Sequence, residues 1–144
     1  MKINLTFKGQ TALERKLREM GPRYERAGMI AQIEEGTAIM TVARRRAPKE
    51  SLHLERSGFL RWLGNRIVMG FGGLAGPYAQ RMHDDHTYTP SHPGTGPGYL
   101  SVPLRQAKSG MLARLGARIR QMTDRGKALP NPRFIHPQSP WEDR

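Results

Sequence analysis

The chain has 144 residues, the usual size of one domain, and only 37% of them are hydrophobic, so the sequence predicts a single small core. It carries 24 Lys and Arg against 12 Asp and Glu, a formal net charge of +12, and it contains no cysteine. Disulfides and thiolate metal sites are thereby excluded, and because no apolar run reaches the roughly 20 residues that span a bilayer, we expect no membrane partner.

The first third of the chain has the pattern of one strand followed by helices. Residues 1–7 alternate between apolar and polar side chains, which predicts a short strand. Helical spacing of leucines and methionine follows over 13–20 and stops at Gly21-Pro22. From Arg23 to Arg46 apolar residues recur in steps of three and four, which predicts one long amphipathic helix, stopped by Pro48.

Two glycines, Gly28 and Gly36, fall inside this long helical pattern. Each weakens a helix by up to about 1 kcal/mol relative to alanine. Either a close backbone contact on that face or simple tolerance would account for them.

The middle of the chain is typical of a hairpin followed by a long loop. Phe59–Leu63 and Arg66–Phe71 are predicted to be paired strands joined by the two-residue turn Gly64-Asn65. A helical turn is expected after Pro77. His86–Gly98 is rich in proline and glycine and predicts a loop, which we call the 86–98 loop; its length indicates a functional role.

The last third is predicted to hold a second long helix and an arm. Tyr99–Val102 is expected to be a short strand, and Gln106–Met122 a helix with one apolar stripe. Residues 126–144 contain four prolines and are predicted to form an extended arm beyond a single domain of residues 1–125.

These elements together predict an α+β fold. In it, a small, mostly antiparallel sheet packs against the helices Arg23–Arg46 and Gln106–Met122. Ten or so large apolar side chains are expected in the core, so contacts between subunits are expected to supply much of the stability.

One cluster contains side chains that can bind a metal: His83, Asp84, Asp85 and His86, with His92 nearby. Adjacent residues point in different directions on a regular backbone, so a solvated acidic turn is the favoured interpretation, and a metal-dependent hydrolase is the least favoured function. Nucleophile, zincin and phosphate-binding motifs are absent from the sequence. We predict no catalytic residue, cofactor or metal, and therefore no enzyme.

The cations suggest a polyanionic neighbour. Arg44, Arg45 and Arg46 end the first long helix, and Arg114 and Arg118 lie on the second. They are candidates for contact with DNA phosphates or with an acidic protein surface, and the alternative interpretation is a solvated helix face. A small basic nucleic-acid-binding protein is accordingly the alternative function, without base-specific readout.

Three segments, in this order, carry a resemblance to a known family: Ala43-Arg44-Arg45-Arg46-Ala47-Pro48, Pro77-Tyr78-Ala79-Gln80-Arg81-Met82-His83-Asp84-Asp85 and Gly98-Tyr99-Leu100-Ser101-Val102-Pro103-Leu104. Over Leu13 to Met122 the chain resembles the tail-completion and head–tail joining proteins of tailed bacteriophages, also described as minor capsid or tail-component proteins. It departs from the family's Thr-Gly-Leu-like turn after the helix-ending proline, because its loop over Lys49–Gly58 is longer.

The resemblance implies a structural virion protein of the phage neck or tail, assembled in the host cytoplasm. It implies a homo-oligomeric ring of six or twelve copies that joins the head connector to the tail, with portal or adaptor and tail proteins as partners and sequence-independent contact with DNA in the channel. The residues expected at subunit or partner contacts are Pro77, Tyr78, Gln80, His83, Asp84, Asp85, His86, His92, Tyr99, Phe134 and Trp141.

Overall fold

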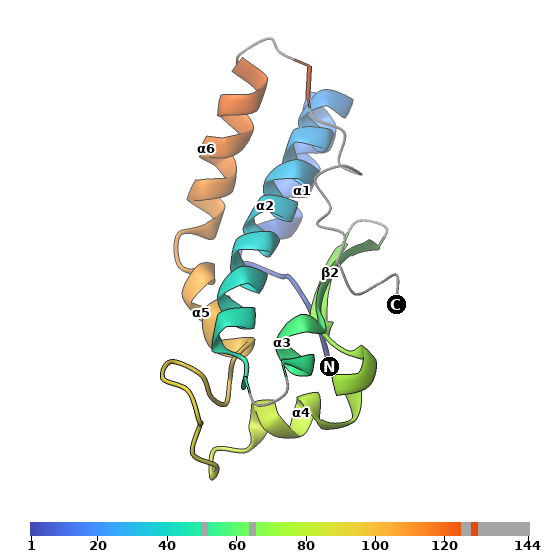
Figure 1. Cartoon of the computed structure of the whole chain (residues 1–144). Helices are drawn as coiled ribbons and strands as arrows, with labels where there is room; N and C mark the ends of the chain where they lie inside the picture. The colour runs from blue at the N-terminus through green and yellow to red at the C-terminus, as the bar shows by residue number, and fades with distance from the viewer. Residues whose placement is uncertain (50–51, 64–65, 125–127, 130–144) are drawn as a thin grey trace.

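The fold is α+β, as the sequence predicts: six α-helices and a three-stranded antiparallel sheet in the part of the chain that the structure describes (Figure 1). The structure is a computed structural model, and it describes residues 1–49, 52–63, 66–124 and 128–129. The elements are β1 (Lys2–Asn4), α1 (Gln10–Met20), α2 (Pro22–Arg46), α3 (His53–Arg56), β2 (Gly58–Leu63), β3 (Arg66–Phe71), the 3₁₀ turn η1 (Gly73–Ala75), α4 (Gly76–Asp84), α5 (Ser101–Lys108) and α6 (Met111–Asp124).

The sheet has the order β1-β3-β2, with β3 in the centre. The predicted strand pairing is confirmed, because β2 pairs with β3 in the register Leu60 to Met69 and Trp62 to Ile67. The predicted turn Gly64-Asn65 lies outside the described residues. On the other side of β3, β1 places Ile3 opposite Met69. Alternate residues of β3 therefore form one buried face, which turns toward the helices.

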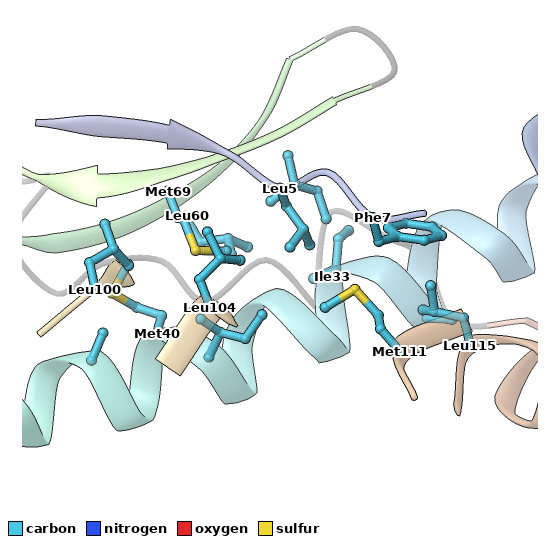
Figure 2. Packing of buried hydrophobic residues seen from close by; sticks show 14 of the residues in the cluster. Leu5, Phe7, Ile33, Met40, Leu60, Met69, Leu100, Leu104, Met111 and Leu115 are labelled. Atoms are coloured by element: carbon cyan, nitrogen blue, oxygen red, sulfur yellow. The ribbon is translucent and has the colours of Figure 1, made fainter. Parts of the chain in front are cut away.

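Helix α2 is the centre of the molecule. It packs against α1 and α6, against α5, and against both strands of the hairpin (Figure 1). Its predicted apolar stripe is buried, and Figure 2 shows Ile33 and Met40 of α2 facing Leu60 and Met69 of the sheet. One long helix thus supplies the surface on which both layers of the fold assemble.

Gly28 and Gly36 mark the closest approaches to α2. A Cβ added to Gly28 would lie 2.5 Å from Leu17 Cδ1 of α1, and one added to Gly36 would lie 2.6 Å from Leu60 Cδ1 of β2. Close packing against neighbouring elements therefore accounts for both glycines.

The second long helical pattern is divided into two helices. Its stripe is buried as expected, including Leu104, Met111 and Leu115 (Figure 2). However, α5 ends at Lys108 and α6 begins at Met111, because Ser109 is extended and Gly110 has a left-handed φ of 70°. The prediction of one continuous helix over Gln106–Met122 is therefore wrong.

Two shorter assignments also differ from the sequence prediction. The expected strand Tyr99–Val102 is wrong, because the chain turns there and α5 begins at Ser101. The segment 49–58, expected to be a loop, contains the four-residue helix α3. The helical turn expected after Pro77 is confirmed as part of α4.

The core is larger than the sequence suggests. Besides the helical stripes and the sheet face, it buries Leu54 of the short helix α3 and four residues that lie between the regular elements, Leu5, Phe7, Tyr99 and Leu100. The arm of residues 126–144 falls outside the described residues, except for Ala128 and Leu129, and Leu129 is half-buried against this core.

Candidate partner interface

Tyr99 fixes the base of the 86–98 loop. Its side chain is 0% exposed, and its hydroxyl donates a hydrogen bond of 2.6 Å to the carbonyl oxygen of Ala79 in α4. Its ring meets the rings of Phe71 and His83 edge to face, with centroids 4.9 Å and 5.1 Å away. Burial raises the pKa of the Tyr99 hydroxyl above its usual value, so it stays protonated and remains a donor.

His83 is the second fixed point and joins α4 to the start of α5. Its Nε2 lies 3.2 Å from the backbone nitrogen of Ser101, and its Nδ1 lies 2.7 Å from Asp84 Oδ1. A backbone N–H can only donate, so Nε2 is the acceptor and Nδ1 carries the proton that binds Asp84. The backbone nitrogen of Gly98 also donates to the carbonyl oxygen of His83 at 2.8 Å.

A third contact holds the loop to the end of α2. The backbone nitrogen of Gly96, two residues before the end of the loop, donates to the carbonyl oxygen of Arg46 at 3.0 Å. Helix C-termini leave carbonyl groups without helical partners, and here the loop supplies one donor. The loop is thus attached to α2, α4 and α5, and Figure 1 shows it projecting beyond them at the lower left.

Hydrogen bonds also shape the two carboxylates before the loop. Asp85 Oδ1 accepts from the backbone nitrogen and hydroxyl of Thr87 at 2.8 Å and 2.6 Å, which lowers the pKa of Asp85. The hydrogen bond from His83 and a second from Gln80 lower the pKa of Asp84. Both acids are therefore ionised at neutral pH and start the loop with negative charge.

The predicted contact residues divide into a buried and an accessible set. Tyr99 and His83 are buried within the chain and hold the loop in place, so their side chains are not on the accessible surface. Tyr78 and Asp85 are half-buried. The accessible ones are Pro77, Gln80, Asp84, His86 and His92. Phe134 and Trp141 lie outside the described residues.

The histidines and carboxylates do not converge on a metal site. Within the described ranges, no group of three or more metal-ligating side chains is close enough to hold an ion. Across the same ranges, no helix is both long and apolar enough to cross a bilayer.

The three arginines at the end of α2 have different environments. Arg44 is half-buried, its guanidinium donates to the carbonyl oxygen of Gly58, and burial lowers its pKa. The Nε atoms of Arg44 and Arg46 are buried and, within the described structure, have no hydrogen-bond partner. Arg45 alone of the three is exposed. Arg44 is accordingly placed to join α2 to β2 rather than to meet a polyanion.

The arginines of α6 are paired with acids of α2. Arg114 binds Glu35 through two hydrogen bonds of 2.9 Å and 3.0 Å, and Arg118 binds Glu34 in the same way at 2.8 Å and 3.0 Å. Each acid raises the pKa of its arginine. Adjacent acids on α2 and arginines four residues apart on α6 are the sequence signal of this pairing.

A groove between α1, α2 and β2 was not predicted. It encloses about 220 Å³ and is lined by Glu14, Leu17, Arg18, Glu25, Met29, Gln32 and Trp62. Trp62 lies in the predicted strand Phe59–Leu63, and a large aromatic side chain in that strand was the available sequence signal.

Comparison of the chain with models of known protein families, with characterised proteins and with solved structures finds no match.

Proposed function

We propose that this chain is a structural subunit of a tailed-phage particle. Copies of it form a ring in the neck or tail-completion region, between the head connector and the tail, and the chain performs no catalysis. The order of the three segments that resemble the head–tail joining family supports this proposal.

The observation that carries the proposal is that the second and third of these segments meet in space, and that the first holds the loop between them. Arg46, from the first segment, accepts the hydrogen bond of Gly96 in the loop. His83, from the second, binds Gly98 and Ser101 of the third, and Tyr99 of the third binds Ala79 of the second. Segments that are far apart in the sequence thus form one base that presents one projecting loop.

The accessible surface around this base is polar. His86 and His92 are exposed on the loop, and Gln80 and Asp84 are exposed on α4 beside it. A contact built on such a surface depends on hydrogen bonds and charge more than on apolar burial. It suits the joining of preformed protein components whose own cores are already complete.

Charge reversal on the loop tests this proposal. The triple variant His86→Glu, Ser91→Glu and His92→Glu places three negative charges on exposed positions. We expect self-association, measured by sedimentation velocity, to weaken at least tenfold, while the thermal midpoint stays near that of the parent because exposed substitutions change stability by about ±0.5 kcal/mol.

The matched control carries the same change of net charge on α1. Thr11→Glu, Ala12→Glu and Arg15→Gln are all exposed and lie on a different element. This variant should assemble like the parent. Equal loss of assembly in both variants would mean that total charge, and not the loop, governs association.

The second candidate function is sequence-independent binding of nucleic acid, which the exposed Arg45 and the net charge of +12 favour. It predicts a shift of duplex DNA on a low-salt gel that disappears as salt rises. Arg45→Gln should reduce the salt slope by about 1, whereas Arg114→Gln should change it little, because Glu35 already holds that guanidinium. The absence of any shift at low salt would eliminate this function.

A further inference from the structure

The groove between α1, α2 and β2 has an apolar floor and a charged rim. Leu17, Met29 and Trp62 form the apolar part, and Leu17 is buried while the other two are half-buried. At about 220 Å³, the groove exceeds the ~150 Å³ of an apolar cavity that binds benzene. It therefore has room for one aromatic side chain.

The described chain ends close to one end of this groove. The guanidinium of Arg23, at the start of α2, donates to the carbonyl oxygen of Thr123 at 3.4 Å, so α6 ends where α2 begins. Leu129 then packs against the core, and Figure 1 shows residues 128–129 at the end of the molecule where α1 passes into α2. Glu25 of the groove lies one helical turn from the same corner.

The length of the groove matches a short extended segment. From Glu25 to Gln32, α2 advances about 10 Å, at ~1.5 Å per residue. Extended, proline-rich chain advances about 3.1 Å per residue, so Phe134 lies within about 15 Å of Leu129 along the chain. The first large apolar side chains after Leu129 are Phe134 and Ile135, and this length of chain is enough to bring them to the groove.

Charge is complementary as well. Glu14 and Glu25 give the rim two carboxylates against the single guanidinium of Arg18. The residue before Phe134 is Arg133, so a cation arrives beside these acids when Phe134 enters the groove.

We propose that residues 130–138 of the same chain occupy this groove, with Phe134 against Leu17, Met29 and Trp62. A segment joined to the body only one residue before it begins has an effective concentration of about millimolar or more, which favours the chain's own segment over that of a second copy. This contact does not rest on the proposed role in a virion. It gives the arm a binding site on the subunit itself.

Tryptophan fluorescence in the full-length chain tests the contact. Trp141→Phe leaves Trp62 as the single tryptophan. In that background, Phe134→Ala with Ile135→Ala should raise acrylamide quenching of Trp62 at least twofold and move its emission to longer wavelength. Gln138→Ala with Ser139→Ala, at the last residue of the segment and the first beyond it, is the control and should change neither. Quenching of Trp62 that is the same in all three proteins would overturn the proposal.

Dilution distinguishes the two sources of the segment. Quenching that stays constant over a hundredfold dilution is expected for the chain's own segment, whereas quenching that rises on dilution would mean that a second copy supplies it and that the proposal is wrong.

Disulfide trapping provides an independent measurement, because the chain has no cysteine of its own. Arg18→Cys with Arg133→Cys should form a cross-linked monomer on mild oxidation. The control Arg120→Cys with Arg133→Cys, in which Arg120 lies exposed on α6, should not. A cross-linked dimer, or no cross-link with Arg18→Cys, would contradict the assignment.

Discussion

Tyr99 combines full burial with one hydroxyl group, and that hydroxyl is used to join two segments that are 20 residues apart in the chain. Burying a hydroxyl without a hydrogen-bond partner costs free energy. The bond to Ala79 removes this cost and allows Tyr99 to pack between Phe71 and His83. The same residue thereby fixes the distance between α4 and the start of α5, and with it the base of the 86–98 loop.

Removing this hydroxyl should weaken the fold measurably. We expect Tyr99→Phe to lower the free energy of unfolding by about 1 kcal/mol, the net value of one buried hydrogen bond. Tyr88→Phe is the comparison, because the Tyr88 hydroxyl makes a longer bond of 3.2 Å to Met82 in a partly buried position. Urea unfolding measures both. A loss for Tyr99→Phe no larger than that for Tyr88→Phe would show that the loop base does not depend on this bond.

Sequence reasoning located the residues of the loop base but not their roles. The order of the three segments directed attention to His83, Asp84 and Tyr99, and all three lie at the base of the loop. The histidine and the tyrosine were expected at a partner contact, although they are buried. Burial of His83 depends on its pairing with Ser101, 18 residues away, and local periodicity carries no information about such a contact.

At the scale of elements, α2 and the hairpin were predictable because each has both a periodic pattern and a clear stop. The division between α5 and α6 was not. Leu104 and Met111 are seven residues apart, which keeps the apolar stripe in phase across the break. Only Gly110, with its left-handed φ, marks the turn, and a glycine within a helical pattern is also compatible with a continuous helix.

The glycines of α2 and α6 provide a matched test of element packing. Gly36→Ala would bring a Cβ within 2.6 Å of Leu60 Cδ1, so we expect a loss of about 1–3 kcal/mol from overpacking, although alanine is the better helix former. Gly116→Ala meets nothing closer than the Arg120 guanidinium at 3.8 Å, and should stabilise the protein by about 0.5–1 kcal/mol. Thermal unfolding of the two variants compares them directly. Stabilisation by both substitutions would show that the Leu60 side chain moves aside with no loss of stability.

The ion pairs between α2 and α6 contribute less to the stability of the fold than the packing of Gly36 against Leu60 does. Arg114–Glu35 and Arg118–Glu34 are bidentate but largely open to solvent, and such pairs are worth up to about 1 kcal/mol each. Their main effect is on charge, because they remove two arginines of α6 from the surface field that would attract a polyanion.

At the scale of the whole molecule, the core is large enough that stability does not require assembly. A small core suggested that neighbouring subunits must supply the stability, but the structure buries a continuous cluster that extends over the sheet, α2 and α6 (Figure 2). The chain therefore has its own interior, and the proposed ring does not follow from a lack of stability. The case for the ring rests on the projecting loop, on the contacts that hold the loop to α2, α4 and α5, and on the polar surface around it.

The size of the purified full-length protein, measured by sedimentation velocity from low micromolar to several hundred micromolar, tests the proposed ring most directly. The measurement is made on the protein alone and in mixture with portal and tail proteins of a tailed phage. We expect a closed species of fixed copy number, six or twelve as the family resemblance implies, that the charge-reversed loop variant no longer forms. A monomer at every concentration, with no binding to those neighbours, would contradict the account.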